Sequence, residues 1–356
     1  LSPRVTWRSK NAATLQKIPL FIDPVVQTTE KSLGLSDMLG VHLSNINFRT
    51  FNLQSWNGSS WVTLAAVDTS EGFQGKFIKK GNTLISNDST KQFLLQYGEA
   101  IGWRAELTSG ETTKIVKIRM NSEGIWSTDA TVKQAVIQYD TSLTDPSSIP
   151  ASGNIKLIPD KITFLKNRLD GVNLGQYALS IDIPVQTTLE GYFQIGSLLM
   201  GSVAFPAPQY QRGRTISFNP NIQAQESLDG MFFARKMSNG RRTASIAWTE
   251  PIDTTRLYDL NPDYWKVSNT AGAQPVANYG DPYLMNGIFR YLSNKEPLVY
   301  LPSIPKDPAG DQVLLNHREE HMLARTTGEV SVESVIGEER VSEMFRVATV
   351  NLEEIE

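Results

Sequence analysis

The chain contains no cysteine among its 356 residues. This absence excludes a disulfide framework, a cysteine-ligated zinc site and a thiol nucleophile. It suits a protein that is made in a reducing cytoplasm and must later survive outside it, where a free thiol is a liability. Histidine is scarce as well, with three residues in the whole chain.

Long apolar runs and a strong charge of one sign are also missing. The run 195–200 is among the longest, far short of the roughly 20 residues that a membrane helix needs. The formal net charge is −3 and the sequence pI is about 5.8, so nothing global attracts nucleic acid or an anionic membrane. We therefore expect no membrane span and no nucleic-acid specificity, in a folded chain long enough for two to three domains.

The sequence from residue 41 onward predicts a mainly β protein. Residues 48–56 and 61–65 are rich in β-formers, and Asn57-Gly58 between them is a strong hairpin signal. Further strands are expected at 73–78, 92–97, 102–107, 114–120, 131–139, 156–158, 161–165, 176–183 and 191–200. Short strands at regular spacing indicate a β-sandwich over 41–204.

The two flanking regions differ from this pattern. Prolines at positions 3, 19 and 24 predict an irregular segment over 1–40. Residues 205–356 predict a second β-rich, barrel-like domain that opens with a four-strand meander over 215–248. Short helices are expected near 253–260 and 282–293, and strands at 298–301, 330–336 and 346–355.

His317-Arg-Glu-Glu-His321 is the sharpest chemical signal in the sequence. It matches the inverted zinc-peptidase pattern, in which two histidines share one helix face and Glu320 acts as the base. The alternative is a short, charged, solvated helical turn. We favour the alternative, because Thr326-Thr327-Gly328 interrupts the pattern and strands follow.

Tryptophans 56, 61, 103 and 126 fall within the expected sandwich. Exposed indoles on such a sheet could stack on sugars, but large aromatic side chains in strands more commonly fill a core. We favour core packing and keep a sugar platform as the alternative.

Charge is distributed unevenly over the second region. Residues 206–249 hold two acids, Glu226 and Asp229, and six basic residues. The basic residues are Arg212, Arg214, Arg235, Lys236, Arg241 and Arg242. Residues 318–356 hold four arginines against ten acids, which are Glu319, Glu320, Glu329, Glu333, Glu338, Glu339, Glu343, Glu353, Glu354 and Glu356. These are either two solvated surfaces or the two sides of a head-to-tail contact between identical subunits.

Other motifs of known chemistry are missing from the sequence. It contains no phosphate-binding loop, dinucleotide fingerprint, nucleophile elbow or calcium loop, and His42 has no evident serine or aspartate partner. We expect no enzyme activity, and no catalytic, cofactor-binding or metal-binding residues.

Two parts of the chain resemble known families. Residues 48–65 with Trp103-Arg-Ala-Glu-Leu look like a discoidin or galectin-like sandwich. Residues 191–201, 214–224 and 241–248 resemble minor tail proteins of long-tailed bacteriophages, of the distal-tail or baseplate kind. The resemblance implies a hexameric ring under the tail tube, with sandwich domains carried outward that sometimes grip host sugars. In such proteins the ring-forming domain usually comes first, whereas here the sandwich comes first.

The sequence therefore predicts a structural component of a phage tail tip, located in the virion and made in the host cytoplasm. It assembles into a ring or joins the tail tube to the host-contacting apparatus. The expected partners are identical subunits, other tail proteins such as tube, hub and fibres, and a host-surface glycan. The alternative is a carbohydrate-binding sandwich protein, and a zinc peptidase or a glycosidase is less favoured.

Overall fold

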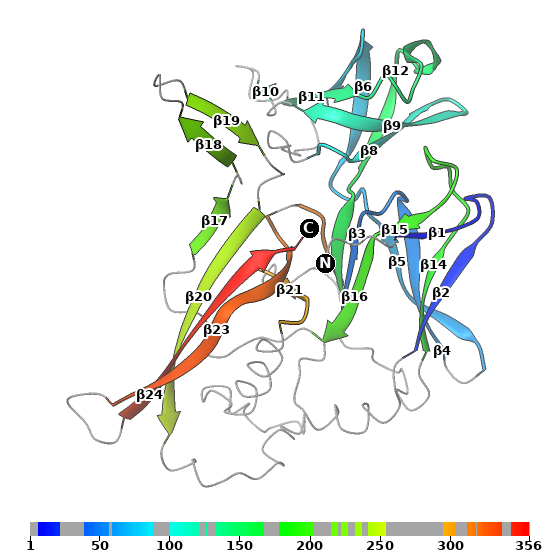
Figure 1. Cartoon of the computed structure of the whole chain (residues 1–356). Coiled ribbons are helices and arrows are strands. Elements are labelled where there is room, and N and C mark those ends of the chain that lie inside the picture. Colours follow the sequence, from blue (N-terminus) through cyan, green and yellow to red (C-terminus); the bar gives the residue numbers. More distant parts are fainter. Residues whose placement is uncertain are drawn as a thin grey trace.

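The computed structural model shows a chain built almost entirely of antiparallel β-strands, which confirms the mainly β prediction (Figure 1). The described residues are 6–21, 39–56, 59–87, 100–121, 125–126, 133–166, 178–202, 215–219, 222–226, 232–236, 241–253, 295–302, 312–317, 319–336 and 343–355. The one described helical segment is the short 3-10 turn η1 (Pro146–Ser148), which Asp145 caps through its side chain.

Two four-stranded sheets form a sandwich. The front sheet has the strand order β2 (Gln16–Phe21), β14 (Ala178–Ile183), β4 (Thr50–Trp56), β5 (Trp61–Asp68). The middle sheet has the order β16 (Ser197–Ser202), β3 (Leu39–Ser44), β13 (Lys161–Lys166), β22 (Gln312–Leu315). Alternate residues of each strand point into a shared core, as Phe51 and Leu53 of β4 do against Phe164 and Ile181.

The β4–β5 hairpin is confirmed, since Trp56 pairs directly with Trp61 across the predicted turn. The expectation of an irregular segment over 1–40 is wrong for β1 (Trp7–Arg8) and β2, which pair with β15 (Gln194–Ile195) and β14. Pro19 does not prevent β2 from forming, because β2 lies at the edge of its sheet, where one side of the backbone needs no donor.

A closed barrel is inserted between β5 and β13, within the region 41–204 for which only β-sandwich structure was expected. Its strands are β6 (Gln74–Lys80), β7 (Thr83–Asn87), β8 (Arg104–Ser109), β9 (Thr112–Asn121), β10 (Ile125–Trp126), β11 (Lys133–Tyr139) and β12 (Ser152–Ile158). The barrel closes because β11 pairs with both β7 and β9. Alternating strands look the same in sequence whether a sheet closes or stays open, so the pattern did not distinguish the two.

The third sheet, the C-terminal sheet, has the order β17 (Thr215–Asn219), β20 (Arg241–Asp253), β24 (Glu343–Glu354), β23 (Met322–Ile336), β21 (Leu298–Tyr300). It differs from the expected meander, because β17 pairs with β20 while β18 (Ile222–Glu226) and β19 (Phe232–Lys236) form a separate hairpin. In the described residues the sheet is open, since β17 and β21 are its edges. The two predicted helices lie outside the described residues, apart from Asp253, which ends β20.

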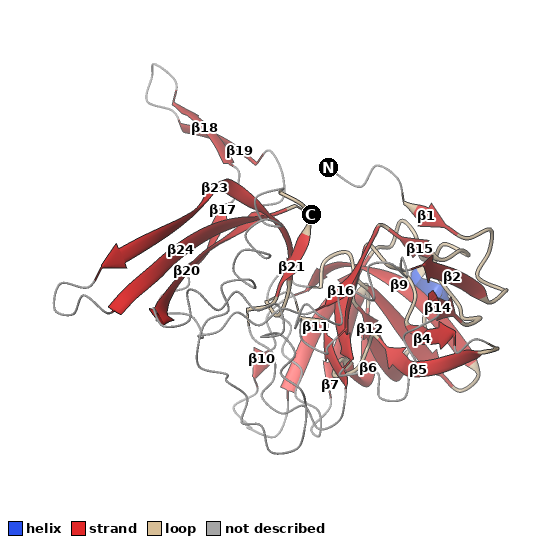
Figure 2. Cartoon of the chain, turned by 90° about the horizontal axis from the view of Figure 1, so that it is seen from below, coloured by secondary structure: helices blue, strands red, loops and turns tan. Residues whose placement is uncertain are grey.

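The C-terminal sheet packs against the sandwich at one end and projects from it at the other (Figures 1 and 2). β22 belongs by sequence to the C-terminal region but pairs with β13 in the middle sheet, so the expected boundary near residue 204 is crossed. Among the described residues, no helix has the length and apolarity needed to span a bilayer.

Candidate functional site

The His317–His321 motif lies in a tight turn between β22 and β23, which we call the junction turn (residues 316–321). The helical interpretation of this motif is wrong. A single turn hydrogen bond joins the Glu320 amide to the His317 carbonyl at 3.1 Å, and β23 starts directly after His321. A zinc site of this kind needs a helix that continues for several turns beyond the motif. The residues that follow are strand-forming and belong to β23, so no such helix forms.

The motif side chains face different parts of the molecule. The His317 ring packs on Phe73 of the barrel, with ring centroids 4.7 Å apart. The His321 ring meets His42 of β3 edge-on, with centroids 5.4 Å apart. Glu320 accepts bonds from the backbone amides of Asn316 and His317, both at 3.0 Å, so its carboxylate closes the turn. The geometry is that of a packing motif, and the two imidazoles of the pattern do not converge.

Asn316 adds a third link from the same turn. Its side-chain amide donates to the carbonyls of Thr69 at 3.1 Å and Glu71 at 2.8 Å, in the segment that leads from β5 into the barrel. The junction turn therefore touches the barrel, the middle sheet and the C-terminal sheet at once. The motif is visible in the sequence but its packing role is not, because the partners of the turn are more than 240 residues away in the chain.

A buried ionic network lies beside the junction turn. Arg242 of β20 binds Glu354 of β24 at 2.7 Å and donates to the His321 carbonyl at 2.9 Å. Lys161 of β13 in the middle sheet reaches Glu354 at 3.5 Å. Burial of Glu354 opposes its ionisation, but the hydrogen bonds from Arg242 and the charge of Lys161 outweigh it and hold the pKa of this carboxyl below its usual range.

A second group of buried polar contacts joins the barrel to the sandwich. Arg104 of β8 donates through Nε to Glu190 at 3.0 Å and through Nη1 to the Ile46 carbonyl at 3.2 Å. Asn47 donates to the other oxygen of Glu190 at 3.0 Å. The Arg104 side chain is almost fully buried, so these charge-assisted contacts hold the barrel against the sandwich.

The two charged segments meet within one chain. β20 pairs with β24 along its length, and Arg241 and Arg325 both reach Glu353, at 3.1 and 3.6 Å. Together with the Arg242–Glu354 pair, this neutralises part of both segments in cis and weakens the charge argument for a head-to-tail contact. Arg212 and Arg214 lie outside the described residues.

The tryptophans divide between core and surface. Trp103 is 3% exposed and packs edge-on against Phe73 in the barrel core. Trp56 and Trp61 are half-buried on the outer side of the front sheet, with ring centroids 5.5 Å apart. The ammonium of Lys17 lies 4.4 Å from the centre of the Trp61 ring and donates to Gln54 at 3.2 Å. Nothing is described of the Trp126 side chain.

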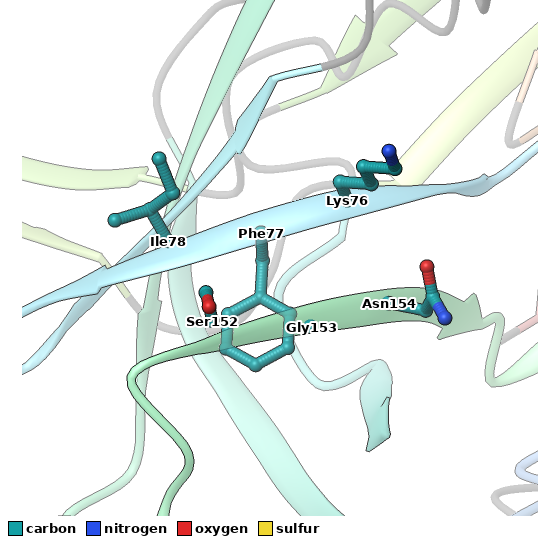
Figure 3. A pocket seen from close by; sticks show the side chains of 6 residues that line it. All are labelled: Lys76, Phe77, Ile78, Ser152, Gly153 and Asn154. Atoms are coloured by element: carbon teal, nitrogen blue, oxygen red, sulfur yellow. The ribbon is translucent and has the colours of Figure 1, made fainter. Parts of the chain in front are cut away.

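A depression of about 330 Å³ lies over β6 and β12 of the barrel, as Figure 3 shows. Its lining consists of Lys76, Phe77, Ile78, Ser152, Gly153 and Asn154. Lys76 is its single titratable group, which leaves no acid–base pair for catalysis. Among the described residues, no three histidine, aspartate or glutamate side chains gather closely enough to hold a metal ion.

Comparison with known proteins adds no relative. No protein-family model, curated protein or solved structure matches the chain.

Proposed function

We propose that the chain is a non-enzymatic structural subunit of a bacteriophage tail tip, which joins copies of itself and other tail proteins in the virion. The observation that carries the proposal is the long ribbon of β20, β24 and β23, which extends away from the body of the molecule (Figures 1 and 2). β23 alone has 15 residues, and its antiparallel rise of about 3.4 Å per residue gives it a length of about 50 Å.

The edges of this ribbon suit it for assembly. β17 covers only residues 241–245 of β20, and β21 covers only residues 322–324 of β23. Along the rest of the ribbon, the described residues contain no further strand on either edge. Sheet edges without a neighbouring strand are templates for pairing with another chain.

The polar contacts between the parts of the body support the same role. Buried polar contacts lock the barrel to the sandwich and the sandwich to the C-terminal sheet, through Arg104–Glu190 and Lys161–Glu354. A subunit that transmits force or sets spacing in a particle needs its parts held at fixed angles.

Light scattering of the purified chain across a dilution series tests the proposal, together with co-purification with the neighbouring tail proteins. The informative variant is Val335→Lys on β23, because lysine on an edge strand opposes pairing with another chain. The matched control is Met120→Lys, at an exposed apolar position on the barrel. We expect a discrete oligomer that Val335→Lys dissociates and Met120→Lys leaves intact. A wild-type chain that stays monomeric and binds no tail protein would refute the proposal.

A second function, recognition of a surface glycan, is favoured by the Trp56–Trp61 pair. The two half-buried rings lie beside the amide of Gln54, the hydroxyl of Thr63 and the ammonium of Lys17. Apolar ring faces next to hydrogen-bonding groups match the chemistry of a saccharide. A glycan array with the wild-type chain, Trp61→Ala and the control Trp7→Ala tests it, because Trp7 is a partly exposed tryptophan on a different strand. Binding that only Trp61→Ala abolishes would support recognition, and no binding by any of the three would exclude it.

A further inference from the structure

Four side chains of different chemistry border the depression over β6 and β12 (Figure 3). Lys76 and Ile78 come from β6, and Ser152 and Asn154 come from β12. The strand register places Lys76 directly opposite Asn154 and Ile78 directly opposite Ser152. Residues two apart on a strand point to the same face of a sheet, and all four are exposed. An ammonium, an amide, a hydroxyl and an aliphatic group therefore surround one hollow on the outside of the barrel.

The pair of residues between them leaves the middle of the hollow clear. Phe77 is 1% exposed and belongs to the barrel core, and Gly153, which lies opposite it, contributes only backbone to the lining. A Cβ at Gly153 would lie 2.2 Å from the Thr108 carbonyl oxygen, so the close approach of β8 requires glycine here. No side chain from this pair fills the space between the two outward-facing pairs.

The polar groups of the lining are available to a ligand. Among the described residues, Lys76, Ser152 and Asn154 have no partner for a side-chain hydrogen bond or an ion pair. Lys79 on the same strand differs, because its ammonium donates to two backbone carbonyls in and next to η1. The ammonium of Lys76 is therefore the one in this lining that can bind an anion without losing a contact within the described chain.

Size and chemistry together indicate the class of ligand. The volume of about 330 Å³ is near the lower end of the range of about 300–1,000 Å³ for small-molecule pockets, which suits a single sugar ring. An ammonium binds a carboxylate or a phosphate, and an amide and a hydroxyl both donate and accept hydrogen bonds as sugar hydroxyls do. Ile78 is 51% exposed and offers an apolar surface to the C–H groups of the ring. The aromatic ring in the lining, Phe77, is buried, so the depression offers no surface for stacking a nucleobase.

We propose that the depression over β6 and β12 binds a saccharide that carries an acidic group. Lys76 binds the carboxylate or phosphate, Asn154 and Ser152 bind hydroxyls of the same sugar, and Ile78 packs against its ring. This site is separate from the Trp56–Trp61 surface, which belongs to the front sheet of the sandwich. It depends only on the barrel lining and holds whether or not the chain belongs to a phage tail.

An NMR titration of the full chain tests the site. The probes are glucuronate, glucose 6-phosphate and glucose, which share one ring and differ in the acidic group that Lys76 would bind. We expect the amide signals of residues 76–78 and 152–154 to shift saturably with one or both acidic sugars, at millimolar concentrations, and more weakly with glucose. Saturation by glucuronate alone assigns the anion as a carboxylate, and saturation by glucose 6-phosphate alone assigns it as a phosphate.

Two charge-reversal variants separate a specific site from general attraction to a basic surface. Lys76→Glu should weaken the binding of acidic sugars by roughly tenfold, because it replaces an attraction by a repulsion, and should leave the response to glucose unchanged. Lys80→Glu is the matched control, since Lys80 is exposed on the same strand, lies outside the lining and changes the net charge equally. It should bind the acidic sugars as the wild-type chain does.

Three results would overturn the proposal. One is the absence of saturable shifts at 76–78 and 152–154 with both acidic sugars. The others are equal affinity for glucose and the acidic sugars, and equal weakening by Lys76→Glu and Lys80→Glu. Because these titrations need neither an oligomer nor a tail protein, their outcome is separate from that of the assembly experiment.

Discussion

Arg104 in the barrel and Glu190 in the sandwich form a nearly buried ion pair that spans the connection between two separately folded cores. The same guanidinium also donates to the Ile46 carbonyl, and the same carboxylate accepts from Asn47. The barrel is thus held on the sandwich by directed polar bonds as well as by apolar contact, and the loss of either partner should be costly.

Arg104→Ala is expected to destabilise the chain by roughly 3–5 kcal/mol, because it leaves a shielded carboxylate without its cation. Urea unfolding, monitored by circular dichroism, measures the change. Arg104→Lys is the conservative control and should recover only part of the loss, since an ammonium cannot bond Glu190 and Ile46 with one rigid group. An alanine variant as stable as the wild type would show that the pair does not fix the barrel.

Acid should weaken the C-terminal sheet through Glu354. Its folded-state pKa lies below the ordinary value of 4.5, so it contributes stability that is present above that value and is lost as the pH falls through the folded-state pKa. Thermal melts between about pH 7 and pH 3 should show this loss. In Glu354→Gln the pH-dependent part should be absent and the melting temperature lower throughout, because Arg242 remains buried without its anion. An unchanged slope in the variant would reject this role.

Gly153 on β12 should not tolerate a side chain. A Cβ there would lie 2.2 Å from the Thr108 carbonyl oxygen and 3.1 Å from the Phe77 ring. Gly153→Ala is therefore expected to cost about 1–3 kcal/mol as strain spreads through the barrel wall. Gly201→Ala is the control, because a Cβ at that strand position meets nothing within 4 Å. Equal melting temperatures for both variants would contradict the close approach of β12 and β8.

The two classes of tryptophan should respond differently to truncation. Trp103→Ala removes a ring from the barrel core and should cost about 3–5 kcal/mol, whereas Trp61→Ala removes a half-buried surface ring and should cost clearly less. Acrylamide quenching of each single-tryptophan variant provides an independent reading, with stronger quenching for Trp61. A Trp103 that is quenched as readily as Trp61 would place the ring outside the core.

The histidine motif should not bind zinc tightly. The rings of His317 and His321 face Phe73 and His42, and Glu320 holds two backbone amides. Emission spectroscopy after dialysis against zinc should give the same metal content for the wild-type chain and for His317→Ala. A full equivalent of zinc that the variant loses would restore the peptidase interpretation.

Sequence patterns predicted the strands well where neighbouring residues alone determine the strand and its turn. The Trp56–Trp61 hairpin and the strands around 161–165 and 346–355 follow from β-formers between turn residues, and the structure confirms them. Pro19 misled the prediction of the N-terminal segment, because whether a proline is tolerated depends on whether its strand is central or at an edge. The sequence does not encode that position locally.

The sequence by itself determined the β class, the absence of thiol chemistry and most strand positions. These properties depend only on which residue types are present and on their immediate neighbours. Only the tertiary structure decided that one series of strands closes into a barrel and that the two charged segments neutralise each other in one sheet. It also decided that the zinc-like motif forms a turn in which the His321 ring packs against His42, a residue near the other end of the chain. These outcomes depend on pairing between distant segments, and such pairing is settled by the packing of whole sheets rather than by neighbouring residues.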